Sequence, residues 1–245
     1  MRVKLVVAYD GTDYCGWQVQ PNGITIEEVL NRTLSELLGE EITVIGASRT
    51  DAGVHSLGNV AVFDTNTKMP ADKISYALNQ RLPGDIAVQD SCEVPFDFHP
   101  RFAASRKTYE YRILNRSFPV PTLRRDTLFY HHKLNEEDMA EAAAFLMGEH
   151  DFTSFASVHA QTKTFVRTVY DLSVRRSKED VIHIRIRGNG FLYNMVRIIA
   201  GTLIEVGAGK REPEDMLRIL EGRNRALAGP TAPAHGLTMI GLEYL

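Results

Sequence analysis

The residues best suited to chemistry lie in one loop, Gly46–Gly58, which reads GASRTDAGVHSLG. A single carboxylate, Asp51, stands at its centre, and Arg49 precedes it by two residues. Ordering such a loop costs on the order of 1–2 kcal/mol per fixed residue, and its small residues bury little apolar surface in return. Loops of this kind more often carry function than support a core. The simpler alternative is a surface turn in which Asp51 caps a backbone amide.

A lone carboxylate can attack or stabilise a sugar C1′, as in the first step of glycosidic-bond cleavage. To stay ionised in a partly dry site, it needs a cation nearby. Arg49 is close in sequence, and Arg197 is the odd residue in the apolar helical stretch 195–199. The alternative for Arg197 is a guanidinium that extends past the helix to solvent. Tyr109 can stack on a base, or it can be an ordinary half-buried strand aromatic.

Several common kinds of site are absent from the sequence. It contains no nucleophile elbow, no dinucleotide-binding fingerprint and no phosphate-binding GxxxxGK[ST] loop. The eight histidines lack metal-ligand spacing, and the two cysteines, Cys15 and Cys92, are far apart and form no CxxC pair. We therefore expect neither a metal nor an organic cofactor.

The composition is typical of a soluble globular protein, with 44% hydrophobic and 24% charged residues among 245. The N-terminal segment becomes acidic too early for a signal peptide. The longest apolar stretch, 191–206, is too short and too charged to span a membrane. Two isolated cysteines suit a reducing compartment, so we expect a cytoplasmic protein.

Charge is distributed unevenly along the chain. Residues 1–100 hold 7 basic and 14 acidic side chains, whereas residues 101–245 hold 21 and 17. Basic clusters at 101–125 and 163–187, interleaved with aromatic residues, are what a polyphosphate partner requires. A solvated strand face would explain one such cluster. Two in the same half of the chain favour a nucleic-acid partner.

The elements that must position these residues follow from hydrophobic periodicity. In the first half, Thr25 and Glu28 form a capping box that begins a helix. The expected strands are 2–10, 42–47, 59–64 and 86–94, and the expected helices run from 26 to 38 and onward from Pro70. This order, β-α-β-β-α-β, is that of the split βαβ or ferredoxin-like motif.

The second half repeats the same order of elements without visible sequence repetition. Strands are expected at 106–115, 127–132, 165–175, 181–187 and 237–245, and helices at 135–147, 191–206 and 213–223. We therefore predict an α/β (α+β) protein of two tandem ferredoxin-like, RRM-like units, residues 1–104 and 105–245. Their sheets are expected to be mainly antiparallel and to form a cleft for a ligand.

One motif connects these residues to a known family. Residues 49–55, RTDAGVH, resemble the catalytic signature of the TruA-type tRNA pseudouridine synthases. Other stretches resemble motifs of that family in the same order: YDG at 9–11, GWQ at 16–18, LPGDIAV at 82–88, FHPRF at 98–102, KTYEYR at 107–112, DFTSF at 151–155, GFLYNMVR at 190–197 and HGL at 235–237. The resemblance covers nearly the whole chain.

The resemblance implies a fold, a reaction and a set of roles. The expected reaction converts uridine to pseudouridine at positions 38, 39 and 40 of the tRNA anticodon stem-loop, in a cofactor-free homodimer. Asp51 matches the catalytic nucleophile, Tyr109 the tyrosine that packs on the target base, and Arg197 the arginine that pairs with the aspartate. Arg49 matches a residue that helps to flip the base, and Leu237 one that lines the pocket.

Four positions depart from the family pattern, namely Ser48, Asn59, Val62 and Thr238. They leave open which of the three tRNA positions is modified, and the sequence also leaves open whether Asp51 attacks the ribose or the base. Two alternatives stay in view. One is a catalytically silent RNA-binding protein of the same fold, and the other is an aspartate-dependent nucleoside or glycoside hydrolase, which usually needs a second carboxylate.

Overall fold

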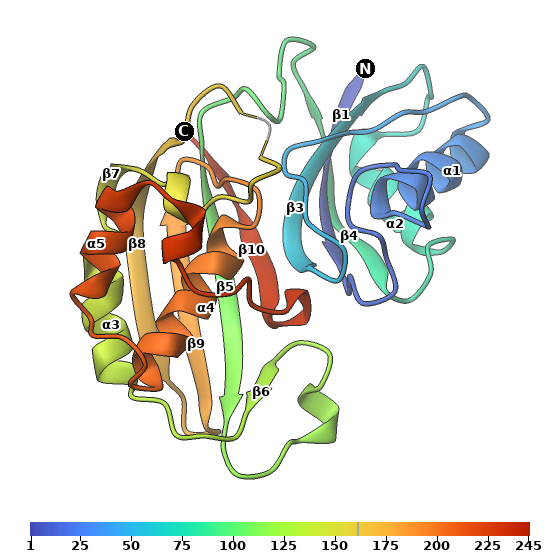
Figure 1. The fold of residues 1–245 in the computed structure, drawn as a ribbon. Helices are drawn as coiled ribbons and strands as arrows, with labels where there is room; N and C mark the ends of the chain where they lie inside the picture. Colours follow the sequence, from blue (N-terminus) through green and yellow to red (C-terminus); the bar gives the residue numbers. More distant parts are fainter. Residues whose placement is uncertain (161) are drawn as a thin grey trace. The chain divides into compact units, whose positions relative to one another are not determined.

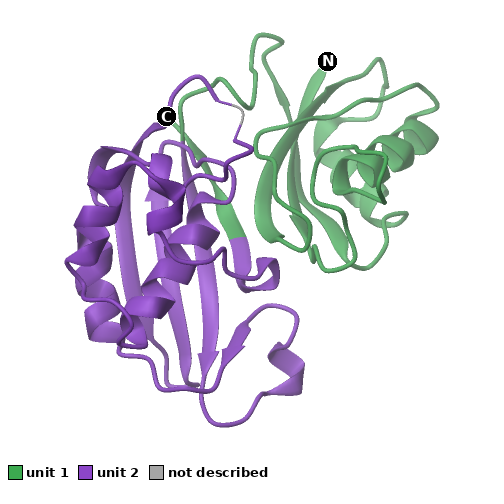
Figure 2. Ribbon diagram, in the orientation of Figure 1, with its two compact units in different colours: residues 1–105, 239–245 green, residues 106–238 purple. Residues whose placement is uncertain are grey.

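The structure is a computed structural model that describes residues 1–160 and 162–245. These residues form ten β-strands and five α-helices, as Figure 1 shows. They group into two compact units, coloured separately in Figure 2: unit 1 holds residues 1–105 and 239–245, and unit 2 holds residues 106–238. The last seven residues, which we expected in the C-terminal unit, therefore group with unit 1.

Unit 1 has the strand order of the split βαβ motif. Its elements are β1 (Arg2–Tyr9), α1 (Ile26–Leu38), β2 (Ile45–Gly46), β3 (His55–Asp64), α2 (Ala71–Asn79) and β4 (Ile86–Val94). β1 pairs antiparallel with β3 on one side and β4 on the other, and β2 pairs antiparallel with β3. The outer edge of β3 also carries β10 (Leu237–Tyr244), most of which belongs to unit 1.

The core of unit 1 lies between its sheet and its two helices (Figure 1). Alternate residues of β1 are fully buried, as expected for a strand with one face on a core. Helix α1 begins as predicted, because the Thr25 side chain accepts a hydrogen bond from the Glu28 backbone N–H. It ends at Gly39, whose φ of +69° is the left-handed conformation that favours glycine.

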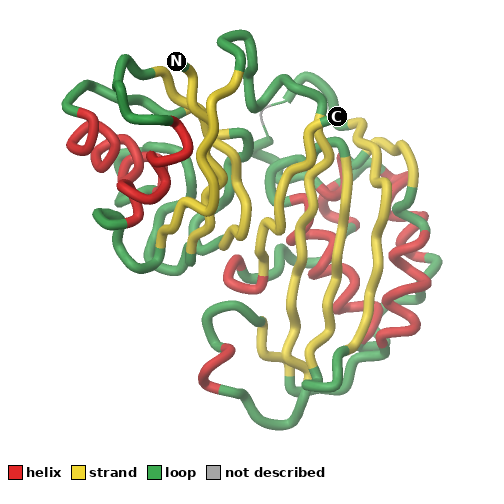
Figure 3. The backbone as a smooth tube through the Cα atoms, turned by 180° about the vertical axis from the view of Figure 1, so that it is seen from behind, coloured by secondary structure: helices red, strands yellow, loops and turns green. Residues whose placement is uncertain are grey.

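The described residues of unit 2 form a larger sheet and three α-helices. Its elements are β5 (Ser105–Asn115), β6 (Leu128–Tyr130), α3 (Glu136–Ala144), β7 (Gly148–Asp151), β8 (Val166–Arg176), β9 (Val181–Gly188), α4 (Met195–Gly207) and α5 (Asp215–Gly222). β5, β9, β8 and β7 pair antiparallel in that order, and β6 lies parallel to β5. The helices cover one face of this sheet, and Figure 3 shows the opposite face from behind. The predicted mixed α/β fold with mainly antiparallel strands is confirmed.

Two differences from the predicted elements have clear physical causes. Residues 42–44 are not a strand, because Ile42 N–H donates to the Ser35 hydroxyl at 2.9 Å and Val44 N–H to the Asn31 side chain at 2.8 Å. Side chains of α1 thus take the place of a strand ladder. Helix α4 begins at Met195 rather than near residue 191, because Asn194 has a φ of +62° and breaks the helical path.

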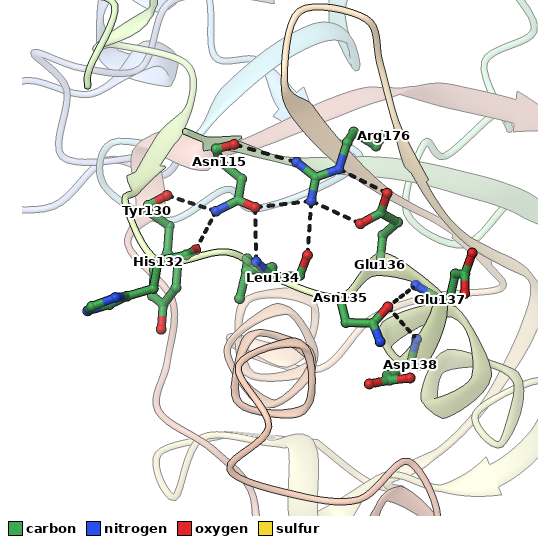
Figure 4. Close-up of polar contacts among 9 residues, drawn as sticks. All are labelled: Asn115, Tyr130, His132, Leu134, Asn135, Glu136, Glu137, Asp138 and Arg176. Carbon is green, nitrogen blue, oxygen red and sulfur yellow. Dashed lines mark hydrogen bonds and ion pairs between the residues drawn. The ribbon is translucent and has the colours of Figure 1, made fainter. Parts of the chain in front are cut away.

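A polar cluster ties the ends of β5 and β8 to α3 in unit 2 (Figure 4). Arg176 donates to both carboxylate oxygens of Glu136 at 2.9 Å and to the carbonyl of Leu134 at 3.0 Å. It also reaches the side-chain oxygen of Asn115 at 3.0 Å, and Asn115 donates in turn to the carbonyl of Tyr130 at 2.9 Å. Few of these groups are exposed, so the cluster satisfies acceptors that would otherwise be buried without donors.

We expect Arg176→Met to lower the free energy of unfolding by about 1–3 kcal/mol, because several acceptors lose their donor at once. The hydrogen bond from Arg176 holds the pKa of Glu136 below its usual range. The stabilisation from the pair is therefore present above the usual carboxyl pKa and is lost as pH falls through the lowered one. Urea unfolding at neutral pH and at about pH 3 should show that the loss of unfolding free energy caused by Arg176→Met is smaller in acid. Arg218→Met, which removes an exposed pair with Asp215, is the control; an equal loss there would contradict the prediction.

Candidate active site

Asp51 lies in the loop between β2 and β3 of unit 1, and its side chain is half-buried. The residue before it, Thr50, is buried and held in two ways. The hydroxyl of Tyr9 lies 2.7 Å from the hydroxyl of Thr50, and the backbone N–H of Trp17 donates to the carbonyl of Thr50 at 3.1 Å. The backbone that enters Asp51 is thus fixed by the end of β1 and by the segment after it.

The other side of Asp51 is closed by backbone hydrogen bonds. Val54 N–H donates to the Asp51 carbonyl at 3.1 Å, which forms a tight turn, and Gly53 N–H donates to the carbonyl of Tyr14 at 3.3 Å. None of these bonds uses the carboxylate of Asp51. The loop backbone on both sides of Asp51 is therefore fixed by hydrogen bonds.

Two glycines let neighbouring backbone approach this loop closely. Gly16 has a φ of +84°, and a Cβ there would lie 2.5 Å from the carbonyl oxygen of Thr50. A Cβ on Gly11 would overlap the carbonyl of Val54. Both glycines belong to the N-terminal motifs that resemble the family, so those motifs serve as a platform beneath the loop.

The departures Ser48 and Asn59 lie against each other. The side-chain amide of Asn59 donates to the carbonyl of Ser48 at 3.0 Å, and both residues are buried. Within residues 1–160 and 162–245, the Ser48 hydroxyl and the Asn59 side-chain oxygen have no hydrogen-bond partner. Val62 is buried in β3 opposite Ile45. Ser48 and Asn59 are therefore joined to each other by one hydrogen bond at the base of the loop.

His55, the last residue of the RTDAGVH motif, is a structural residue in this arrangement. Its Nδ1 lies 3.0 Å from the backbone nitrogen of Gly11 and 3.1 Å from a carboxylate oxygen of Asp10. The ring is only 6% exposed. It fastens the start of β3 to the chain that leaves β1.

Two arginines lie at the loop of unit 1, Arg49 within it and Arg101 beside it. Arg49 is exposed, and Arg101 donates from Nε to the carbonyl of Gly46 at 3.0 Å. Burial, and after it the charge of Arg49, lowers the pKa of Arg101, so the two guanidinium groups influence each other. The sequence places Arg101 in a basic cluster and in the FHPRF motif, but does not by itself assign it to this loop. Its place in the FHPRF motif was the signal that could have assigned it to this loop.

In unit 2, Tyr109 lies on β5 opposite Ile186 of β9 and is 8% exposed. The edge of its ring contacts Phe191, with ring centroids 5.2 Å apart and planes at 83°. Arg197 lies in the first turn of α4, where Nη1 donates to Asn194 at 2.9 Å and Nε donates to the carbonyl of Ala232 at 2.8 Å. The chain thus holds this guanidinium, rather than leaving it extended to solvent.

Leu237 begins β10 and is 6% exposed. The segment before it packs on Tyr111, since a Cβ on Gly236 would lie 2.6 Å from that ring and the Tyr111 hydroxyl donates to the carbonyl of Pro233 at 2.9 Å. Burial raises the pKa of Tyr111, and the nearby charge of Arg197 opposes this. Arg197, Tyr111 and the segment leading to Leu237 therefore form one packed group in unit 2.

The predicted site residues are thus divided between the units. Asp51 and Arg49 share a loop of unit 1, while Tyr109, Arg197 and Leu237 belong to unit 2. The expected ion pair between Asp51 and Arg197 stays a prediction. In the part of the chain that the structure describes, no group of three or more His, Cys, Asp or Glu side chains is placed to hold a metal ion. Likewise, none of the described helices is long and apolar enough to cross a membrane.

We expect Tyr9→Phe to lower the free energy of unfolding by about 1–3 kcal/mol, because it leaves the buried Thr50 hydroxyl without this partner. The amide of Trp17, which donates to the Thr50 carbonyl, should exchange its hydrogen faster. Urea unfolding and hydrogen exchange measure the two effects. Tyr76→Phe removes the same hydroxyl from a side chain that is 70% exposed and serves as the control. Equal behaviour of the two variants would show that the Tyr9 hydroxyl does not hold the loop.

A family model, several relatives and some solved structures resemble this chain. A family model described as tRNA pseudouridine synthase matches residues 5–103 and 142–244. Three relatives, each called tRNA pseudouridine synthase A, align over 99% of both chains: those of Thermoanaerobacter sp. (strain X514), 50% identical over 242 residues, Acetivibrio thermocellus, 49% over 242, and Ruminiclostridium cellulolyticum, 46% over 243. Among solved structures, a chain of an H/ACA RNP bound to a substrate RNA is 14% identical with a TM-score of 0.35, covering 97% of this chain and 45% of that one.

Proposed function

The chain belongs to the tRNA pseudouridine synthase family and is an isomerase that acts on tRNA, and on this premise we propose its site and mechanism. It converts uridine to pseudouridine at positions 38, 39 and 40 of the anticodon stem-loop, and Asp51 is the nucleophile. The observation that carries the proposal is the RTDAGVH loop, because buried contacts to Thr50 and backbone bonds on either side fix the backbone that carries its single carboxylate.

The reaction rearranges bonds within one nucleotide. The uridine must first leave the stack, at a cost of a few kcal/mol. Asp51 then attacks the ribose or the base, the bond between N1 and C1′ breaks, and the uracil rotates while it is held. C5 bonds to C1′, the bond to Asp51 breaks and frees its carboxylate, the C5 proton leaves, and N1 gains a proton. The net change is an isomerisation, so the reaction needs neither an oxidant nor a second substrate.

The remaining roles follow from the properties of each side chain. Arg197 keeps Asp51 ionised and in place, and its two hydrogen bonds within unit 2 leave a held guanidinium suited to this. Tyr109 packs on the detached uracil, and the Phe191 contact fixes its ring for that purpose. Leu237 lines the pocket and Arg49 helps to flip the base. A pocket that holds the detached base is as necessary as the nucleophile.

The charge of unit 2 supports phosphate contacts. On the sheet face away from the helices, the register places Arg112 of β5, His183 of β9 and Arg175 of β8 side by side. Arg185 lies on the same face of β9 and is exposed, and Arg187 follows two residues further along that strand. Arg112 already forms an ion pair with Asp126, so the exposed arginines are the better candidates for contacts with RNA phosphates. Exposed Arg116, Arg124 and Arg125 extend the positive charge beyond β5.

The homodimer and the cytoplasmic location are parts of the same proposal. The family resemblance supports the first, and the two unpaired cysteines support the second. Light scattering at working concentration should give twice the 27.5 kDa mass of one chain. A single-chain mass would remove the dimer from the proposal without touching the reaction.

The test of the function is tritium release from unmodified tRNA labelled at uridine C5, followed by mapping of the product positions. We expect release from uridines of the anticodon stem-loop. Free uracil in the products would instead indicate the hydrolase. Binding of tRNA without any release would indicate the silent RNA-binding protein. Release from uridines elsewhere in the tRNA would keep the activity and reject the proposed positions.

A further inference from the structure

An exposed aromatic pair stands out in the chain that leaves β4. The rings of His99 and Phe102 are stacked, with centroids 4.3 Å apart and planes at 26°. Phe102 is nevertheless 81% exposed, so one face of its ring is covered by His99 and the other is left to solvent. Single exposed apolar side chains are common on proteins. A phenylalanine ring that is stacked on one face and exposed on the other can stack with a further aromatic ring on its exposed face.

The turn that carries this pair is ordered on all sides. The N–H groups of Phe102 and Ala103 donate to the carbonyl of His99 at 3.1 and 3.0 Å, and Arg101 N–H donates to the His99 ring at 3.2 Å. The buried Pro100 between them accepts a hydrogen bond from the Tyr244 hydroxyl at 3.0 Å. The aromatic surface therefore needs little ordering when a ligand binds.

Positive charge lies beside the pair. Arg101, between the two rings in sequence, donates to the carbonyl of Gly46 at 3.0 Å. Burial and, after it, the charge of the exposed Arg49 lower the pKa of the Arg101 guanidinium. Two neighbouring guanidinium groups repel each other, and a phosphate between or beside them relieves that repulsion. An exposed ring next to positively charged side chains is the combination that binds single-stranded nucleic acid.

The same contact places the pair close to the reactive loop. Gly46 ends β2 and begins the loop that carries Asp51, so Arg101 links the aromatic turn to the base of that loop within unit 1. We propose that the His99–Phe102 stack is a platform for an unpaired base of the tRNA near the target uridine, with Arg49 and Arg101 on the adjoining phosphates. This inference rests on the proposed function.

The platform predicts a binding effect that depends on the ring. We expect Phe102→Ala to raise KM for an anticodon stem-loop on the order of ten-fold, with kcat within about two-fold, since stacking of one base has an effect of this size. Phe102→Trp keeps an aromatic face and should stay within about three-fold of the wild type. Phe96→Ala removes a phenylalanine that is 65% exposed in the same segment, and is the matched control.

A second measurement reports the stacking itself. A stem-loop with 2-aminopurine at one unpaired position at a time should lose fluorescence on binding at one position at least. That loss should disappear with Phe102→Ala and persist with Phe96→Ala. Equal KM values for wild type and Phe102→Ala, or equal effects of Phe102→Ala and Phe96→Ala, would overturn the platform. A change of oligomer mass in Phe102→Ala, without a change in RNA binding, would make the ring a contact between copies of the chain and would also overturn it.

The outcomes separate this inference from the function on which it rests. Tritium release by the wild type with no effect of Phe102→Ala on KM or fluorescence removes the platform and leaves the function. Stem-loop binding that depends on the Phe102 ring, without tritium release, removes the proposed reaction and leaves the platform. Thermal unfolding of each variant shows whether a loss comes from binding or from misfolding.

Discussion

Asp51→Asn is expected to reduce tritium release to below about one per cent of the wild-type rate, because loss of the nucleophile removes several kcal/mol of transition-state stabilisation. Asparagine has nearly the same shape and no negative charge, so it cannot form the covalent bond. tRNA affinity should stay within a few fold. The measurement is single-turnover tritium release together with stem-loop binding.

The contacts around the loop explain why this effect should appear in the chemical step. Thr50 is held by Tyr9 and Trp17, and the Asp51 carbonyl by Val54, and none of these bonds involves the Asp51 side chain. The substitution therefore leaves these bonds of the loop unchanged. Asp90→Asn removes one negative charge from an exposed position on β4 and controls for the change in net charge. Activity well above one per cent in Asp51→Asn would mean that another group is the nucleophile.

The same variant tests the proposed partner of Asp51. If Arg197 pairs with the carboxylate, Arg197→Met should cost more stability in the wild type than in the Asp51→Asn background, because removing one partner leaves the other charge uncompensated. A double-mutant cycle of urea unfolding measures the difference. Additive effects would show that the two side chains do not interact.

Gly16→Ala is expected to have the second largest effect, with activity reduced about a hundred-fold and unfolding free energy reduced by about 2–4 kcal/mol. Gly16 has a φ of +84°, where a side chain is strained by about 1–2 kcal/mol. The added methyl would also lie 2.5 Å from the Thr50 carbonyl oxygen and 3.1 Å from the backbone nitrogen of Ala52. All of these atoms are backbone, so the loop that carries Asp51 must move.

A second glycine separates the two causes. Gly39 has a φ of +69°, close to that of Gly16, but a Cβ there would meet nothing within 4 Å. Gly39→Ala should therefore cost only about 1 kcal/mol of stability and leave tritium release unchanged. The difference between the two variants in unfolding free energy and in activity gives the contribution of the steric clash between the added methyl at position 16 and the loop. If the two variants behave alike, the close approach of Gly16 to the loop has no consequence for catalysis.

Much of this architecture could be predicted because local pattern and tertiary packing agree. The alternation of buried residues along β1 and the capping box at Thr25 are both visible in the sequence, and both elements form as predicted. The RTDAGVH motif likewise pointed to the loop around Asp51. In these places a short stretch of chain contains the information that determines its own structure.

The errors occur where side chains from elsewhere satisfy the backbone. Asn31 and Ser35 of α1 bind the amides of residues 42–44, which no periodicity in that stretch indicates. The bond from Arg101 to Gly46 joins residues 55 positions apart in the sequence. The FHPRF motif is visible in the sequence, but the position of Arg101 beside the loop and the stacking of the two rings are not. Long-range contacts of this kind require the fold to be known first.

The division of unit 1 between residues 1–105 and 239–245 has a consequence for how the protein matures. On the ribosome, the whole of unit 2 is made before the strand that lies along β3 can appear. At 5–20 residues per second, those 133 residues take on the order of ten seconds to synthesise. During that interval part of the edge of β3 is an open template for another chain. The nascent protein therefore completes its first unit last, and is most exposed to misassembly while its second unit is being made.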